Sequence, residues 1–402
     1  MDIIFANRGD CLSSPGGDTV QMLKTKEYLE KNHNVNVKIC LKTEQIVNDK
    51  NSNIVHVFNI QTIDETLEYI RASKQVGKKI ALSTIYWDLS HYIFMYKIFQ
   101  ITKKVIGKNH NGILNKIFYS LVFFRNILES HNNKDNYKSK NYIEKRKRAL
   151  LEADILLPNS LEELKILSKE FKIDFSELHR KTIIIPNSVD INKDLIKSTS
   201  QIDTKDSFMI KGEFVLEVGR IEVNKNQYNV VKALLDRKEI PIVFIGRIND
   251  NKVDHEYYSK LKDLSEKRGN VFFINQIPQE EVFEYYKRAK VHVLPSFRES
   301  PGLSSLEALY FGCEIVTSSR EFCPVDYYEF NEKAHICNPY STKSIRDAII
   351  DAFDNPKNKV NDKEYFHNFS YGRVSNLTFE AYNKIISHID ENNKMDTGDK
   401  LK

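Results

Sequence analysis

The chain has 402 residues, of which 41% are apolar and 29% are charged. This length is too great for one typical domain and suits two, and the composition excludes a disordered or fibrous protein. The five cysteines form no C-x-x-C pair and no cluster with histidine, which predicts reduced thiols in a cytoplasmic protein, without a zinc site or disulfides. No apolar run is long enough to span a bilayer, and the strand-like start at residues 2–6 leaves no room for a signal peptide.

Short apolar segments alternate with helix-like segments in the first half of the chain. The predicted strands are residues 2–6, 35–40, 53–58, 79–84, 154–157 and 182–186. The stretches between them, such as 19–31 and 64–76, have apolar residues at helical spacing. Short strands rich in Val and Ile are typical of a parallel sheet that is covered on both faces. The alternation therefore predicts a doubly wound α/β domain.

A glycine pair follows the first predicted strand. Gly16 and Gly17 allow the backbone to approach a ligand closely, and Asp18 or Thr19 can cap the helix that follows. An ordinary turn between a strand and a helix would use the same residues.

The segment 92–149 is a basic and aromatic insertion. Its residues 97–149 contain thirteen Lys and Arg against three Asp and Glu, although the net charge of the whole chain is only +5. Large apolar groups mix with cations at 92–99 and 117–125, and a polybasic run follows at 144–148. Such patterns are typical of helices on an anionic membrane surface. One alternative is a helical hairpin packed on its own domain. Another is nucleic-acid binding, although no recognised motif accompanies the charge.

A polar stretch at residues 191–212 is the predicted linker to a second domain. A second series of strands follows it, predicted at 214–218, 241–245, 271–274, 291–294, 314–317 and 334–337. The two α/β domains are accordingly residues 1–190 and 213–365. A last helix is predicted at about 373–389, and the polar tail 391–402 is predicted to be disordered.

A strand, a turn and a helix meet at residues 291–309. The turn contains Pro301 and Gly302, Glu299 precedes it, and Glu307 lies within the helix. The free N–H groups and the dipole of a helix N-terminus favour an anion. A site that attracts phosphate and also carries two acids suits a ligand with phosphate and hydroxyl groups, such as a sugar nucleotide.

Each residue of this stretch also has an ordinary structural explanation. Ser304 and Glu307 have the spacing of a capping box. Glu299 also fits a solvated loop acid, and Pro301 with Gly302 also fits a simple turn. A hydrolase pair is excluded, because eight residues span about 12 Å of helix whereas glycosidase carboxyls lie about 5 to 10 Å apart.

Three segments resemble the retaining GT-B glycosyltransferases of the glycogen-synthase-like family (glycosyltransferase family 4), which use nucleotide-sugar donors. PSFRESPGLSSLEAL, at residues 295–309, resembles the E-x(7)-E signature, with Glu299 and Glu307 as its acids. VGRIEVNKNQ, at residues 218–227, resembles the G-R-x(4)-K segment. FFINQIPQEE, at residues 272–281, lies where that family contacts the nucleobase. The three segments occur in the family's order, each at a predicted strand end.

The resemblance implies a GT-B fold, in which two Rossmann-like doubly wound domains face a cleft. Residues 1–190 would bind the acceptor, residues 213–365 would bind the nucleotide sugar, and residues 366–390 would form a helix that crosses back to the first domain. Arg220 and Lys225 would neutralise the donor diphosphate as charge develops on the leaving nucleotide.

The resemblance also implies roles for the acids and the loops. Glu299 would accept hydrogen bonds from hydroxyls of the donor sugar, and Glu307 from the ribose. The other implied donor contacts are Ser300, Gly302, Leu303, Ile277 and Gly17, and the implied acceptor-side residues are Gly16, Trp87 and Asp88. Many relatives have a histidine-aspartate pair at the last two positions. Trp87 occupies the histidine position here, where it either stacks on an acceptor sugar or fills the domain surface.

The implied reaction is metal-independent transfer of a hexosyl group from a UDP- or GDP-sugar with retention, and no D-x-D motif suited to a divalent ion is present. No cofactor and no nucleic acid are expected. The acceptor would be a glycan or polyprenyl-linked glycan in O-antigen or capsule assembly, with peripheral contact to the cytoplasmic face of the anionic inner membrane. The alternatives are a phosphorylase or epimerase of the same fold and a non-catalytic glycan- or nucleotide-sugar-binding protein.

Overall fold

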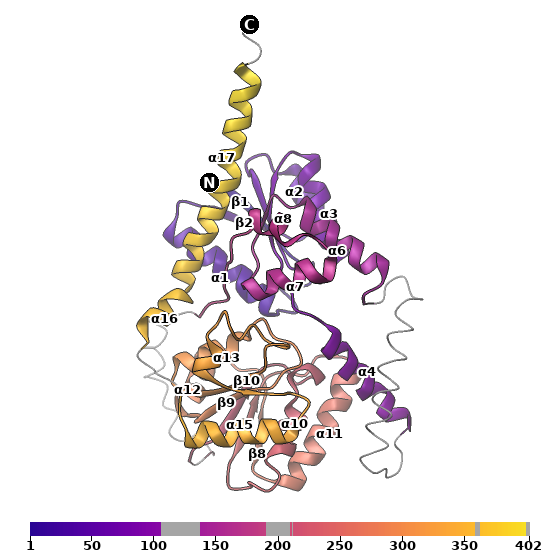
Figure 1. The fold of residues 1–402 in the computed structure, drawn as a ribbon, viewed down its shortest axis with the longest axis vertical. Helices are drawn as coiled ribbons and strands as arrows, with labels where there is room; N and C mark the ends of the chain where they lie inside the picture. Colours follow the sequence, from indigo (N-terminus) through magenta and orange to yellow (C-terminus); the bar gives the residue numbers. More distant parts are fainter. Residues whose placement is uncertain (106–136, 190–209, 211, 358–361, 399–402) are drawn as a thin grey trace. The chain divides into compact units, whose positions relative to one another are not determined.

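The computed structural model describes residues 1–105, 137–189, 210, 212–357 and 362–398. The chain forms two compact units (Figure 1). Unit 1 consists of residues 1–86, 131–190 and 367–402, and unit 2 consists of residues 87–130 and 191–366. The predicted linker at 191–212 falls almost wholly outside the described residues.

Unit 1 is built on a parallel sheet with the strand order β2-β1-β3-β4-β5. Its strands are β1 (Asp2–Ala6), β2 (Asn36–Cys40), β3 (Ile54–Phe58), β4 (Lys79–Ser83) and β5 (Ile155–Leu156). The order reverses between β1 and β3, and ligands of doubly wound sheets bind where this reversal occurs. The strand predicted at 182–186 is reduced to one bridge, between Leu156 and Thr182. Edge strand β5 offers only two residues for pairing, and Pro186 has no N–H to donate.

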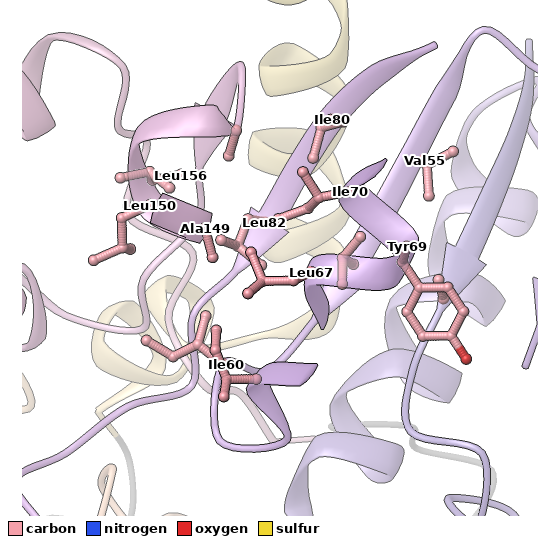
Figure 2. Close-up of a cluster of buried hydrophobic side chains, with 14 of the residues drawn as sticks. Val55, Ile60, Leu67, Tyr69, Ile70, Ile80, Leu82, Ala149, Leu150 and Leu156 are labelled. Carbon is pink, nitrogen blue, oxygen red and sulfur yellow. The ribbon is translucent and has the colours of Figure 1, made fainter. Parts of the chain in front are cut away.

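Helices cover both faces of this sheet. They are α1 (Gly17–Asn32), α2 (Thr43–Asn48), α3 (Ile63–Gln75), α6 (Lys140–Glu152), α7 (Leu161–Phe171), α8 (Phe175–Arg180) and α17 (Tyr371–Gly398), while α16 (Lys363–Asn368) lies at the boundary of the two units. Side chains alternate between the two faces along each strand. Val55 and Ile80 therefore join one cluster with α3 and α6, shown in Figure 2, whereas Ile54 and Ala81 join another with α1 and α17.

Helix α17 is longer than the sequence predicts. It extends to Gly398, where the sequence predicted a disordered tail from residue 391, and residues 399–402 lie outside the described part. Ala381, Tyr382 and Ile385 of this helix are buried in the cluster with β1. This packing explains why the helix belongs to unit 1 although it follows all of unit 2 in the sequence.

Unit 2 is built on a six-stranded parallel sheet in the order β11-β10-β9-β6-β7-β8. Its strands are β6 (Val215–Val218), β7 (Ile242–Ile245), β8 (Val271–Ile274), β9 (Val291–Leu294), β10 (Glu314–Ser318) and β11 (Ala334–Cys337). Each of them coincides with a predicted strand to within one residue at either end. The strand order reverses between β6 and β9, as in a dinucleotide-binding fold.

The helices of unit 2 pack around this sheet. They are α4 (Ser90–Val105), the 3-10 helix η2 (Val223–Lys225), α10 (Gln227–Ala233), α11 (Lys252–Arg268), α12 (Gln279–Arg288), α13 (Leu303–Tyr310), α14 (Phe330–Lys333) and α15 (Thr342–Asp354). On one face of the sheet, an apolar cluster joins Val215, Phe244 and Val293 of three neighbouring strands to helices α10, α11 and α15.

The basic and aromatic insertion is divided between the two units, which corrects its assignment as one part of the first domain. Helix α4 belongs to unit 2, where Met95, Tyr96 and Phe99 pack against the apolar cluster and Lys260 lies 4.5 Å from the ring centroid of Phe99. Its apolar residues therefore have partners within the protein. The second apolar run, at 117–125, lies outside the described residues.

The polybasic run lies on helix α6 of unit 1, and each of its cations has a partner there. The contacts are Lys145 with Asp64 at 2.6 Å, Arg146 with the Gln61 carbonyl at 3.0 Å, Lys147 with the Lys172 carbonyl at 3.4 Å and Arg148 with Glu152 at 2.7 Å. These contacts tie α6 to its neighbours in unit 1. No helix in the described part of the chain has the length and apolar character needed to cross a membrane.

Candidate active site

The reversal of strand order in unit 2 brings the ends of β6, β7 and β9 together. Beyond β6, the Gly219 N–H donates to the Ile245 carbonyl at 2.9 Å, so the backbone continues beside β7. A Cβ atom added at Gly246 would overlap the carbonyl oxygen of Gly219. Gly246 was not predicted as a site residue, although its position directly after a buried strand was a usable signal. The backbone at Gly219, where the G-R-x(4)-K segment begins, is therefore packed directly against the backbone that follows β7.

Lys225 lies at the end of the 3-10 helix η2, with its side chain over Gly219. A Cβ at Gly219 would lie 3.4 Å from Lys225 Cε. The Lys225 ammonium forms an ion pair with the Glu299 carboxylate, and only 15% of the lysine side chain and 9% of the glutamate side chain are exposed. The sequence predicted both residues as site residues without predicting that they pair with each other.

The loop that carries Glu299 is fixed to the loop that carries Lys225. Asn226 has φ +68° and donates to the carbonyls of Pro295 at 3.0 Å and Pro339 at 2.9 Å. The Glu299 N–H donates to the Phe322 carbonyl at 2.8 Å. The Glu299 backbone is thus fixed and its carboxylate is buried against Lys225, so Glu299 is not the solvated loop acid that the sequence left open.

Gly302 joins this loop to helix α13. Its φ is +90°, and an added Cβ would lie 2.7 Å from Leu294 Cδ2 and 3.2 Å from Glu299 Oε2. Gly302 is the N-cap of α13 and has no side chain with which to cap that helix, so the N-terminus presents backbone donors beside Glu299. Ser300 and Leu303, the flanking residues predicted to contact the donor, are partly buried.

Arg220 follows Gly219 at the same end of the sheet. Its guanidinium is 3.7 Å from Glu222 Oε1, and 48% of the side chain is exposed. The Arg220 carbonyl accepts from Gln227 Nε2 at 2.9 Å, which fixes the backbone from which the side chain extends. A long, exposed cation on a fixed backbone is available to bind an anion at this end of the sheet.

Glu307 does not form the capping box that its spacing allows. Helix α13 begins at Leu303, and the Glu307 carboxylate accepts from Gln279 Nε2 at 2.6 Å and from the Tyr286 hydroxyl at 3.2 Å. Both partners are on helix α12, so Glu307 lies toward the β8–α12 turn, where Ile277 is partly buried. Burial raises the pKa of Tyr286 well above its ordinary value, so this hydroxyl remains a donor.

Unit 1 has its own polar cluster at the β1–β3 reversal. Arg8 Nε donates to Asp18 at 2.9 Å, and Asn59 Nδ2 donates to the same carboxylate at 3.2 Å. Burial acts to raise the pKa of Asp18, but the hydrogen bonds and charge of Arg8 more than offset it and lower that pKa. A Cβ at Gly16 would lie 2.8 Å from Asp18 Oδ1, whereas a Cβ at Gly17 would meet nothing within 4 Å. Arg8 and Asn59 were not predicted as site residues, although both follow strands at the reversal.

Trp87 and Asp88 have local structural roles in unit 2. Trp87 is 2% exposed, and its Nε1 donates to the Glu321 carbonyl at 3.3 Å. Asp88 accepts from the Ser90 N–H at 2.8 Å and from the Ser90 hydroxyl at 2.6 Å at the start of helix α4. Of the two explanations left open for Trp87, burial of its ring favours packing over exposed stacking. The acceptor-side roles of both residues remain predictions.

The arrangement in unit 2 therefore combines two cations, an uncapped helix N-terminus and a fixed carboxylate at one strand reversal. Such a set can bind a diphosphate and, beside it, a group rich in hydroxyls. No group of three His, Cys, Asp or Glu side chains among the described residues could hold a metal ion.

Comparison with known proteins shows which proteins this chain resembles. Residues 200–369 match the family model described as "Glycosyl transferases group 1". The D-inositol 3-phosphate glycosyltransferase of Corynebacterium glutamicum is 22% identical over 250 residues, which cover 59% of this chain and 58% of that protein. The serotype-specific mannosyltransferase WbdA of Escherichia coli is 23% identical over 201 residues, covering 46% of this chain and 24% of that protein. The chain thus spans little more than half of the first of these relatives and a quarter of the second.

Solved structures share the fold over nearly the whole chain. Sucrose-phosphate synthase from Thermosynechococcus elongatus superposes with a TM-score of 0.70 at 14% identity, covering 96% of this chain and all of that chain. Anabaena Alr3699/HepE, solved in complex with UDP and glucose, superposes with a TM-score of 0.63 at 12% identity, covering 95% of this chain and 99% of that chain. The chain has the GT-B fold, and its resemblance to the glycosyltransferases is confirmed by a match to the group 1 glycosyl transferases over residues 200–369.

Proposed function

We propose that this protein is a retaining glycosyltransferase that moves a hexosyl group from a UDP- or GDP-sugar to a glycan or lipid-linked glycan. The observation that carries the proposal is the Lys225–Glu299 pair beside the uncapped N-terminus of α13. In the structure these two charges neutralise each other. A nucleotide sugar offers each of them a new partner, because its diphosphate suits the ammonium and its sugar hydroxyls suit the carboxylate.

The cations would act mainly on the leaving group. Arg220 provides a planar donor fork and Lys225 a compact charge, and both would stabilise the diphosphate as the glycosidic bond breaks. The backbone N–H groups at Leu303 would add donors from the helix end. This set of donors supports transfer without a metal ion or another cofactor.

Glu299 would orient the donor sugar rather than attack it. Its backbone is fixed by the contact to Phe322 and its carboxylate is already paired with a cation, so it suits hydrogen bonding to sugar hydroxyls. Glu307, beside Gln279, would accept from the ribose. Retention would then follow from a front-face reaction, in which a donor phosphate oxygen takes the acceptor proton.

A role in surface polysaccharide assembly is supported by the likeness to the serotype-specific mannosyltransferase. A polyprenyl-linked acceptor and peripheral contact with the cytoplasmic face of a membrane remain part of the proposal. The described half of the insertion does not favour that contact, because α4 packs within unit 2 and the cations of α6 have partners.

The deciding experiment measures nucleotide release from UDP-, GDP- and ADP-sugars with EDTA present, with and without membrane extract. Release from one donor, stimulated by extract and lost in Glu299→Ala, would support the proposal. Glu213→Ala is the matched control, because Glu213 is an exposed glutamate of the same unit whose side chain is 64% exposed. Full activity of Glu299→Ala would refute the site. Nucleotide binding without any release would instead favour a non-catalytic binding protein.

A further inference from the structure

Glu217 is a buried acid that the proposed reaction does not use. It lies on β6, is 1% exposed, and neither of its carboxyl oxygens has a hydrogen-bond partner among the described residues. A carboxylate without partners is very costly to bury, whereas a neutral carboxylic acid costs much less. The position therefore favours the protonated form.

The strand places this acid beside the cation of the donor site. Residues two apart on a strand share a face, so Glu217 and Gly219 point to the same side of the sheet. The side chain of Lys225 occupies the space that a side chain at Gly219 would fill, because an added Cβ there would lie 3.4 to 3.9 Å from three of its carbon atoms. Glu217 is thus the neighbouring residue along that face, near enough to Lys225 and Glu299 for the charges of both to act on it.

We propose that Glu217 is a positioning residue that acts through Lys225, and that its ionisation draws Lys225 away from the donor diphosphate. The inference rests on the proposed function. It adds that the affinity for the donor falls at alkaline pH, once Glu217 ionises. While Glu217 is neutral, the Lys225 ammonium is paired with the Glu299 carboxylate, which the donor can replace. Once Glu217 ionises, two carboxylates hold one ammonium, and the diphosphate must compete with a buried charge.

The surroundings of Glu217 agree with this assignment. Burial raises the pKa of Glu217 well above its ordinary value, the Lys225 charge lowers it, and the Glu299 charge raises it further. Bound diphosphate would add negative charge nearby and so favour the protonated form, which links donor binding to proton retention.

The other ionisable groups near this face are named by the elements that carry them. They are Lys225 of η2, Glu299 of the loop after β9, Tyr257 and Asp254 of α11, and Glu222, which precedes η2. Burial raises the pKa of Tyr257 well above its ordinary value, which keeps it neutral. On β9, burial lowers the pKa of His292 to about 3, so it too is neutral.

The test compares the pH dependence of nucleotide binding in wild type, Glu217→Gln and Glu217→Leu. Calorimetric dissociation constants for UDP and GDP are measured from about pH 6 to 9.5. Ionisation of the nucleotide is common to all three proteins and cancels in the comparison. At pH values above the pKa of Glu217, the dissociation constant of the wild type is expected to rise with pH. The rise is about tenfold per pH unit relative to the dissociation constant of either variant. Parallel curves in all three proteins would overturn the inference.

The outcomes separate this inference from the proposed function. Nucleotide binding with parallel curves leaves the donor site intact and refutes only the role of Glu217. If folded wild type binds neither nucleotide at any pH, the proposed function fails and the inference fails with it. If both variants fail to fold, infrared titration of the wild type is the deciding measurement. A protonated-carboxyl band that persists over the pH range in which nucleotide affinity is lost would overturn the proposal.

Discussion

Replacement of Gly302 by alanine tests how the proposed donor site is built. A non-glycine residue at φ +90° costs about 1 to 3 kcal/mol of backbone strain. The new Cβ would also lie 2.7 Å from Leu294 Cδ2 and 3.2 Å from Glu299 Oε2, an overpacking that costs about 1 to 3 kcal/mol. Together these terms predict a loss of about 2 to 6 kcal/mol in the free energy of unfolding.

Gly269→Ala separates the two terms. Gly269, at the end of α11 in the same unit, has φ +74°, and a Cβ there would meet nothing within 4 Å. This control should therefore lose only the strain energy and keep its nucleotide affinity. Urea unfolding followed by circular dichroism measures the stability, and calorimetry with UDP and GDP measures the binding. Equal losses of stability in both variants, with nucleotide affinity unchanged in Gly302→Ala, would refute the packing of Glu299 against Gly302.

Three other substitutions test further parts of the structure. Gly246→Ala should destabilise the protein by about 3 kcal/mol or more in urea unfolding, because its Cβ overlaps the Gly219 carbonyl; a loss below about 1 kcal/mol would contradict that contact. Asp18→Asn should cost about 1 to 3 kcal/mol at neutral pH. Because the folded-state pKa of Asp18 is lowered, this contribution is present above its ordinary pKa and is lost as the pH falls through the folded value, so the two stability curves should converge in acid. Arg220→Met should weaken nucleotide binding about 10- to 100-fold, whereas Arg237→Met, which removes a surface arginine paired with a glutamate, should not.

The local elements were largely predictable from the sequence. Each strand of unit 2 gives a short apolar run that ends in a polar or glycine-rich turn, and each was predicted to within one residue at either end. The segment at 182–186 gives the same pattern but forms one bridge, because pairing depends on the strand it meets as well as on its own residues.

Partners of side chains were less predictable. Spacing alone made Ser304 and Glu307 a capping box, yet Glu307 pairs with Gln279 and Tyr286 of another helix. The pairing of Lys225 with Glu299 likewise depends on β6 and β9 being neighbours, which follows from the strand order. Sequence motifs predicted these residues as site residues, but only the fold shows which of them neutralise each other.

Composition did not show where the insertion packs. Its first helix has an apolar stripe with lysines, a pattern that suits a membrane surface and a protein surface equally well. In the structure, Met95 and Phe99 pack on the apolar cluster of unit 2. The pattern of a helix shows that it has an apolar partner but does not identify that partner.

The return of α17 to unit 1 has a consequence for biosynthesis. Tyr382 and Ile385 complete a cluster with β1, yet the ribosome must synthesise all of unit 2 before it reaches them. Domains often fold as they emerge from the ribosome. The apolar residues on the α17 side of the unit 1 sheet, however, stay uncovered until α17 has been synthesised. Nascent unit 1 is therefore expected to bind chaperones for longer than unit 2. A fragment that stops at residue 366 should aggregate, and α17 supplied as a separate peptide should restore its solubility.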